Sequence, residues 1–286
     1  MKNGQIGQTV IDALTLCYVA ESSLLNHLRS IKHCATFDKF KFYRTLGRAH
    51  FQHFDITHNE QKVATAYFDR FGTHDDESYF WLRLENQVLY NSELMVEVLT
   101  LPELLDLTFN NITHLDLARD FNYNICERIR QLMRNPQLKT IINGKKVANR
   151  DEVIKGITRT CKISLSRDKT KSLTIKQAKA IKNKYDGITL DSYDKMDEIT
   201  NKSEKHYIVE YYNNPKRLYR LELRLNNTDI KKIANSIGII VTERVVFEKE
   251  CLDKLYIQAL QSIIRFTKGR KKLDWDELFR CNGRYI

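Results

Sequence analysis

Residues 113–124 read THLDLARDFNYN and alternate between apolar and polar side chains. In a β-strand, alternate side chains share a face, so this stretch predicts a strand buried on one side. Its leucines point to one face together with Arg119, whereas Asp116 and Asp120 point to the other. Two carboxylates on one face of a strand indicate a candidate site for a ligand.

A second strand is predicted at residues 218–225, LYRLELRL. Its leucines form the core side, and Arg220, Glu222 and Arg224 form the polar side. Arginine gives bidentate contacts to phosphate oxygens, and carboxylate oxygens suit a hard divalent ion. The pattern favours a site that holds both a metal and a phosphate.

A third strand is predicted at residues 187–195, GITLDSYDK, with Asp191, Tyr193 and Lys195 facing outward together. A lysine two residues after a tyrosine can favour the phenolate, which is a competent nucleophile toward a phosphodiester. Each strand also has a structural interpretation, because charges on the wet face are typical of any half-exposed antiparallel sheet. With 14 tyrosines in the chain, Tyr193 alone is weak evidence.

The remaining pattern predicts an α+β fold with a central antiparallel sheet and flanking helices. Asn143-Gly144 is a hairpin signal, and residues 243–264 have apolar residues at helical spacing. We expect two parts: residues 1–235 as a catalytic domain, and residues 236–286 as a helical, basic region for DNA binding or dimerisation.

Charge is distributed unevenly along the chain. Residues 1–110 carry 10 Lys/Arg against 14 Asp/Glu, a net charge of −4, and residues 111–286 carry 37 against 22, a net charge of +15. A polyanion is the natural partner of the second part, although a solubilising surface would look the same. Six widely spaced cysteines and the lack of an apolar run long enough for a membrane span predict a cytoplasmic protein without a membrane partner.

Taken in order, "THLDLARDFNYN", "GITLDSYDKMDEI" and "LYRLELRLNN" resemble the replication initiation proteins of rolling-circle plasmids and related phage. The resemblance covers roughly residues 112–230. It implies a sheet of the relaxase or HUH-endonuclease type, a divalent cation (Mg²⁺ or Mn²⁺), and transesterification by one tyrosine.

By this resemblance Tyr193 would be the nucleophile, Lys195 a catalytic residue beside it, and Asp116, Asp120 and Glu222 the metal ligands. Arg220 and Arg224 would contact phosphate. The glycine-serine-arginine-lysine-serine segment common upstream of the family's tyrosine is missing, so its phosphate contacts would fall to Lys176, Lys179 or other bases. There is also no His-hydrophobe-His motif; His50 and His53 are interpreted as structural or surface residues.

The expected function is therefore nicking of one origin strand, which leaves a 5′-phosphotyrosine link and a 3′-hydroxyl that primes a host polymerase. Expected partners are origin DNA, a host helicase and polymerase in a bacterial cell, and a second copy of the chain. Arg270, Lys271 and Lys272 are candidates for contacts to origin duplex. The alternatives are a non-catalytic origin- or operator-binding protein, a tyrosine recombinase, and a nuclease that uses water.

Overall fold

The computed structural model describes residues 4–47, 50–69, 78–146, 157–158, 161–165, 172–177 and 187–280. The chain forms two compact units. Unit 1 consists of Ile11–Leu115 with Val241–Val245, and unit 2 of Lys2–Val10, Asp116–Ile240 and Val246–Ile286, so far as these ranges are described. The units do not follow the predicted division at residue 235, which concerned function and stays a prediction.

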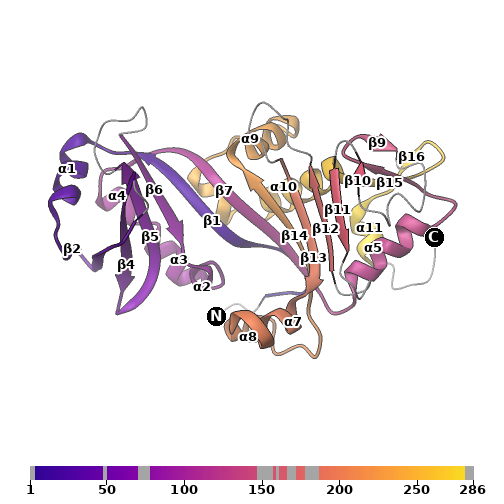
Figure 1. Ribbon diagram of the computed structural model, residues 1–286, viewed down its shortest axis with the longest axis horizontal. Coiled ribbons are helices and arrows are strands. Elements are labelled where there is room, and N and C mark those ends of the chain that lie inside the picture. Colours follow the sequence, from indigo (N-terminus) through magenta and orange to yellow (C-terminus); the bar gives the residue numbers. More distant parts are fainter. Residues whose placement is uncertain are drawn as a thin grey trace. The chain divides into compact units, whose positions relative to one another are not determined.

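Unit 1 is an antiparallel sheet with helices (Figure 1). Its strand order is β7-β1-β6-β5-β4-β3-β2, and the ladders from β1 through β6, β5, β4 and β3 to β2 are antiparallel. Its strands are β1 (Thr9–Val19), β2 (Cys34–Phe37), β3 (Phe40–Thr45), β4 (Phe51–His58), β5 (Gln61–Asp69), β6 (Tyr79–Leu84) and β7 (Thr108–Phe121). Its helices are α1 (Ser22–Ser30), α2 (Asn86–Leu89), α3 (Ser92–Val98) and α4 (Leu101–Leu104), and the η2 turn (Glu243–Phe247) begins in unit 1 and ends in unit 2.

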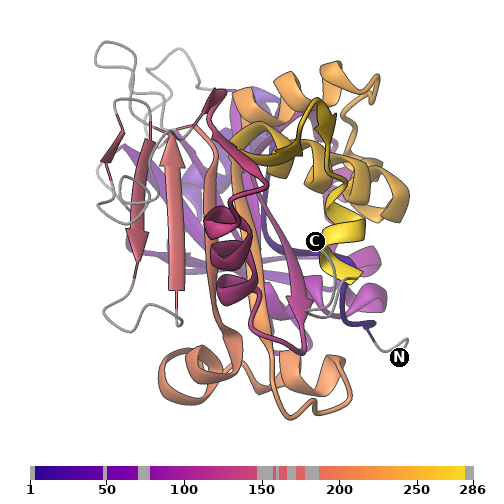
Figure 2. The ribbon, with the colours of Figure 1, turned by 90° about the vertical axis from the view of Figure 1, so that its right-hand side faces the viewer.

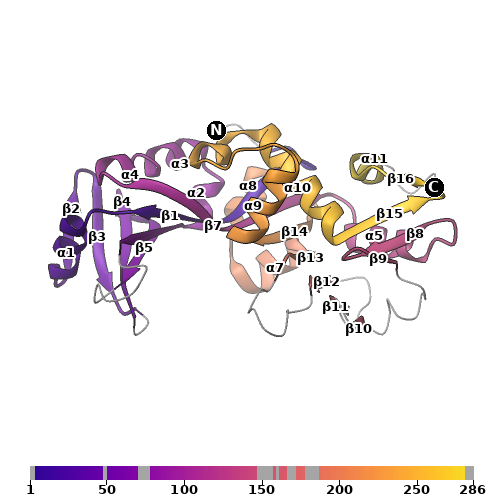
Figure 3. The same cartoon turned by 90° about the horizontal axis from the view of Figure 1, so that it is seen from above.

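The core of unit 1 lies on one face of this sheet, because its strands alternate apolar and polar residues. Phe42, Phe54, Phe68 and Phe80 follow one another on adjacent strands and are fully buried. Arg29 of α1 lies over the ring of Phe68 at 5.9 Å, so α1 covers this face. Figure 3 shows α2, α3 and α4 along one side of the unit 1 strands.

Unit 2 contains a second run of strands in the order β10-β11-β12-β13-β14-β7, and the ladders from β10 to β14 are antiparallel. β1 and β7 contribute residues to both units. The other strands are β10 (Ile157–Thr158), β11 (Cys161–Leu165), β12 (Ser172–Gln177), β13 (Thr189–Asp194) and β14 (Tyr219–Asn226). The helices are α5 (Ile125–Arg134), α7 (Lys195–Glu198), η1 (Ile199–Ser203), α8 (His206–Tyr211), α9 (Asn227–Ser236), α10 (Lys249–Ile263) and α11 (Trp275–Arg280).

Helices α5, α9 and α10 pack on β14. The hydroxyl of Tyr256 in α10 donates to the carbonyl of Leu221 at 3.0 Å, and Leu190, Leu221 and Leu223 are buried. Figure 2 looks onto α5 in front of the β13 and β14 strands, with α9 and α10 beside it. The leucine face of β13 and β14 is thus the covered face, as the alternation predicts.

A smaller sheet in unit 2 has the order β16-β15-β8-β9. Asn143 and Gly144 join β8 (Lys139–Ile142) to β9 (Lys145–Lys146) with positive φ angles of 49° and 77°, so the predicted hairpin is confirmed. The basic segment after α10 lies in the region predicted to be helical, and there the prediction is wrong. The segment forms the hairpin of β15 (Ile264–Lys268) and β16 (Lys271–Lys272), because β15 pairs with β8.

The predicted α+β class with a large antiparallel sheet is confirmed. The predicted helical character of residues 236–286 holds only in part, since β15 and β16 interrupt it. Among the described residues, no helix is long and apolar enough to cross a membrane.

Candidate functional site

The β13–β14 ladder brings two of the three predicted segments together on one face. Tyr193 pairs with Arg220, Asp191 with Glu222, and Thr189 with Arg224. Directly paired residues of an antiparallel ladder share a face. The polar face predicted for each strand is therefore one continuous surface, opposite the leucines that α10 covers.

At the centre of this surface, Glu222 binds two neighbours. The Tyr193 hydroxyl donates to Glu222 Oε2 at 2.8 Å, and Arg224 Nε donates to Glu222 Oε1 at 3.0 Å. Arg224 Nη2 also lies 3.1 Å from Asp191 Oδ2, and the Thr174 hydroxyl donates to Asp191. The Glu222 side chain is 4% exposed and that of Arg224 is 49% exposed, so the carboxylate is sheltered and the guanidinium faces outward.

Asp116 of β7 belongs to the same group. Partial burial acts to lower the pKa of Arg224, but its hydrogen bond to Glu222 and the charges of Glu222, Asp191 and Asp116 outweigh burial and raise it. We call Tyr193, Asp191, Glu222, Arg224 and Asp116 the tyrosine cluster. With three carboxylates and one guanidinium it carries negative charge, which opposes a phosphate unless a further cation joins it.

Asp120 is placed differently from the prediction. Arg220 Nε donates to Asp120 Oδ1 at 2.8 Å, and Arg220 Nη2 donates to Asp120 Oδ2 at 2.6 Å. Both side chains are fully buried. The buried phenol of Tyr212, just after α8, lies against the pair: burial, and then the charge of Asp120, raise its pKa well above the usual value. The alternation places Asp120 and Arg220 on the predicted faces of their strands. This end of the face is covered, however, and the prediction that Arg220 faces solvent is wrong.

The predicted metal would need Asp116, Asp120 and Glu222 to be available to one ion together. Carboxylate oxygens are suitable donors for Mg²⁺ or Mn²⁺. As arranged, however, Asp116, Asp120 and Glu222 do not fit a shared ion, because Arg220 takes both oxygens of Asp120 and Arg224 takes one oxygen of Glu222. Across the described ranges, no three His, Cys, Asp or Glu side chains form a group able to hold a metal ion. The divalent cation stays a prediction.

Lys195 does not continue strand β13, and the prediction that it faces outward is wrong. The Asp194 side chain accepts the backbone N–H of Asp197 at 2.9 Å, which caps the start of α7 at Lys195. Lys195 is 2% exposed; its Nζ lies 2.7 Å from Glu198 and 5.7 Å from the centre of the Tyr193 ring. It can therefore act on Tyr193 through its charge, whereas contact with phosphate would require it to move.

Arg119 points to the opposite face, as predicted. Its guanidinium donates to the Thr9 hydroxyl at 2.9 Å, to Asp276 at 2.6 Å and to Asp253 at 3.1 Å. It also lies over the Tyr256 ring at 4.9 Å. This buried arginine joins β7 to β1, α10 and α11.

The other predicted phosphate contacts are dispersed. Lys176 of β12 is exposed and pairs with Thr189, next to Arg224 on the same face. Lys179 lies outside the described residues. Arg270, Lys271 and Lys272 are exposed on the β15–β16 hairpin, where Lys272 Nζ donates to Gln261 at 2.9 Å. Of the predicted phosphate-binding lysines that the structure describes, Lys176 shares the face of the tyrosine cluster.

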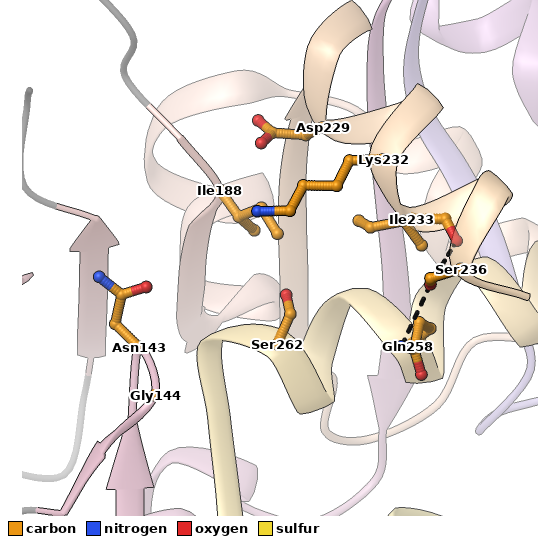
Figure 4. A pocket seen from close by; sticks show the side chains of 9 residues that line it. All are labelled: Asn143, Gly144, Ile188, Asp229, Lys232, Ile233, Ser236, Gln258 and Ser262. Carbon is orange, nitrogen blue, oxygen red and sulfur yellow. Dashed lines mark hydrogen bonds between the residues drawn. The ribbon is translucent and has the colours of Figure 1, made fainter.

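Unit 2 also holds a pocket of about 410 Å³ between the 143–144 turn, α9 and α10 (Figure 4). Lys232 and Asp229 lie on one side of it, and Gln258 Nε2 donates to the Ser236 hydroxyl at 3.3 Å. Among the residues that the structure describes, none of those predicted to be catalytic, metal-binding or phosphate-binding lines it. It is therefore separate from the tyrosine cluster.

Sequence reasoning missed Asp191 and Thr174 as parts of the site, and Tyr212 as the cover of Asp120. Alternation had placed Asp191 on the same face as Tyr193, but its partner Arg224 follows only from the ladder register. Tyr212 has no local signal, since a tertiary fold brings it to Asp120.

Comparison with known proteins does not assign the chain to a family. No protein-family model matches the sequence, and no curated protein matches it significantly.

Proposed function

We propose that this protein nicks one strand of origin DNA by transesterification to Tyr193, as an initiator of rolling-circle replication. The observation that carries the proposal is the 2.8 Å hydrogen bond from the Tyr193 hydroxyl to Glu222, next to the half-exposed Arg224. A nucleophile needs a base within hydrogen-bond reach, and Glu222 meets that condition.

In the proposed reaction the Tyr193 oxygen attacks the phosphorus and gives its proton to Glu222. The bond from phosphorus to the 3′-oxygen breaks, and the leaving oxygen takes up a proton. The 5′-phosphate remains on the tyrosine and a 3′-hydroxyl is released, so the step consumes no water. Arg224 can stabilise the charge that develops on the phosphate oxygens, because its guanidinium is exposed beside the tyrosine.

The proposal includes the relaxase or HUH type of sheet. Its support is the arrangement of unit 2, where helices pack on the leucine face of β13 and β14 while Tyr193 lies on the opposite face. The cytoplasmic location, the host helicase and polymerase, a second copy of the chain, and a plasmid or phage replicon are part of the same proposal and rest on the resemblance alone.

The test uses a single-stranded origin oligonucleotide labelled at its 3′ end, which stays on the 5′-phosphotyrosine fragment, and a denaturing gel. A covalent band that disappears in Tyr193→Phe supports the proposal. Tyr219→Phe is the matched control, since this tyrosine lies on the adjacent strand and pairs with Asp194. An adduct that persists in Tyr193→Phe refutes the assignment of the nucleophile.

One further variant and two conditions separate the alternatives. Glu222→Gln removes the base and should lower the rate of adduct formation by about 100-fold or more, while DNA retention stays near that of the wild type. Parallel reactions with EDTA and with Mn²⁺ test the predicted cation. Cleavage without an adduct favours a nuclease that uses water, and retention without cleavage in every condition favours a non-catalytic DNA-binding protein.

A further inference from the structure

Unit 1 carries a group of aromatic side chains on the face of its sheet that lies opposite the core. Phe51 and His53 of β4, Tyr67 of β5, and Tyr79 and Trp81 of β6 are each partly exposed, whereas the residues that alternate with them are buried. We call these five residues the aromatic face. Because the phenylalanine core occupies the other side, these rings are not needed to build it.

The rings form an ordered array across three strands. His53 pairs with Tyr67, and Tyr67 with Trp81. Their ring centres lie 5.5 Å and 5.4 Å apart, with interplanar angles of 19° and 8°. Phe51 meets Tyr67 and Trp81 edge-on at 5.9 Å and 5.7 Å. Neighbouring rings hold one another in place, so a flat ligand would meet a preformed surface.

Among the described residues of this outward side, three cations (Lys41, Lys62 and Arg83) stand against two carboxylates (Asp55 and Glu85). Lys62 binds Asp55 at 2.8 Å and Glu85 at 3.2 Å, which offsets part of their charge. Arg83 is exposed and pairs with Thr65, two residues along from the Tyr67–Trp81 pair and on the same face.

Arg83 also interacts electrostatically with Tyr67. Burial, the larger effect, raises the pKa of Tyr67, and the positive charge of Arg83 opposes that rise. A guanidinium therefore lies within electrostatic reach of the rings. On β3, Lys41 adds a second exposed cation to the outward side.

We propose that the aromatic face binds single-stranded DNA, with bases stacked on its rings and backbone phosphates near Arg83. Unpaired bases present flat faces to aromatic side chains, and sequence-tolerant binding of single strands combines such stacking with nearby positive charge. A duplex keeps its bases stacked on one another and cannot use this surface in the same way. The choice of DNA over RNA rests on the proposed function, but the stacking surface does not.

The chain has two tryptophans, and they allow a direct test. Trp275 is 1% exposed, so quenching of tryptophan fluorescence by a stacked base should come from Trp81. Titration with oligo-dT should quench the wild type and Tyr193→Phe alike, and the quench should vanish in Trp81→Phe. Heparin and a DNA duplex at equal phosphate concentration are the controls for binding by charge alone.

Affinity is measured separately, by anisotropy of labelled oligo-dT. Trp81→Ala and Tyr67→Ala should each raise Kd by about tenfold or more, equivalent to about 1.4 kcal/mol, and Trp81→Phe should raise it less. Phe247→Ala is the matched control, since Phe247 is 44% exposed in unit 2. Circular dichroism checks that each variant is folded.

Unchanged affinity in folded Trp81→Ala and Tyr67→Ala, or equal quenching by heparin, overturns the inference. Tighter binding of oligo-U than of oligo-dT overturns the choice of DNA. Loss of the covalent adduct in Tyr193→Phe tests the proposed function alone, because oligo-dT binding is read in that same variant.

Discussion

The buried pair of Asp120 and Arg220 predicts a large and specific loss of stability. Both side chains are fully buried and make two parallel hydrogen bonds of 2.8 Å and 2.6 Å. Asp120→Asn removes the negative charge and leaves the guanidinium buried without a counter-ion. Breaking a buried pair in this way costs about 3–5 kcal/mol, which corresponds to a fall in Tm of about 6–20 °C for a domain of this size.

Thermal unfolding followed by circular dichroism measures this effect, with Asp191→Asn as the matched control. Asp191 also binds an arginine, but Arg224 is 49% exposed, so the control should lose less than about 1 kcal/mol. Replacing both partners, as Asp120→Leu with Arg220→Met, should recover most of the stability. An Asp120→Asn variant as stable as Asp191→Asn would refute the reasoning.

The same variants address the predicted metal ligand. If Asp120 holds a divalent cation, Mn²⁺ should raise the Tm of the wild type and not that of Asp120→Asn. If the carboxylate serves only Arg220, Mn²⁺ should shift both proteins equally.

Three further predictions concern other parts of unit 2. Burial acts to raise the pKa of Glu198, but its bond to Lys195 outweighs burial and lowers it below the ordinary 4.5; the pair thus stabilises the fold above that pH and is lost as pH falls through the lowered pKa. When the pH falls from about 5 to about 3, Glu198→Gln should therefore lose less stability than the wild type. Urea unfolding measured at both pH values checks this, and the same loss in the two proteins would contradict it. Gly144→Ala should cost about 1 kcal/mol, because φ is 77° there while the space around the new methyl group is open; an unchanged urea midpoint would count against the hairpin geometry. Tyr256→Phe should cost about 1 kcal/mol, because its hydroxyl bond to a carbonyl of β14 lies in the core, and calorimetry that finds no loss would refute that role.

Alternation predicted which residues share a face, and the ladder confirms it for β13 and β14. Tyr193, Glu222 and Arg224 were placed on one side from the sequence alone, and the register pairs their strands as required. Alternation is local, however, and does not say what covers each face. Arg220 was therefore predicted to face solvent and contact phosphate. In the structure it is buried against Asp120 and the segment that contains Tyr212.

The remaining errors come from interactions that local patterns do not contain. Lys195 continues the alternation of β13, but the Asp194 cap ends the strand before it. The basic segment after α10 lies in the region predicted to be helical. It forms strand β15 instead, because it pairs with β8, which lies more than a hundred residues earlier in the chain. The aromatic face was overlooked because Tyr67 and Trp81 looked like ordinary strand residues until their register aligned them.

The bonds of Arg119 have a consequence for how unit 2 is made in the cell. Thr9, Asp253 and Asp276 all bind this one guanidinium, so the buried Arg119 lacks one of its two carboxylate partners until the ribosome has released residues near position 276. We expect the nascent strand to remain sensitive to proteases, and to depend on chaperones, through most of its synthesis. Truncation before α11 would leave the buried Arg119 with Asp253 but without Asp276. Removing this short helix should therefore reduce the yield of folded protein.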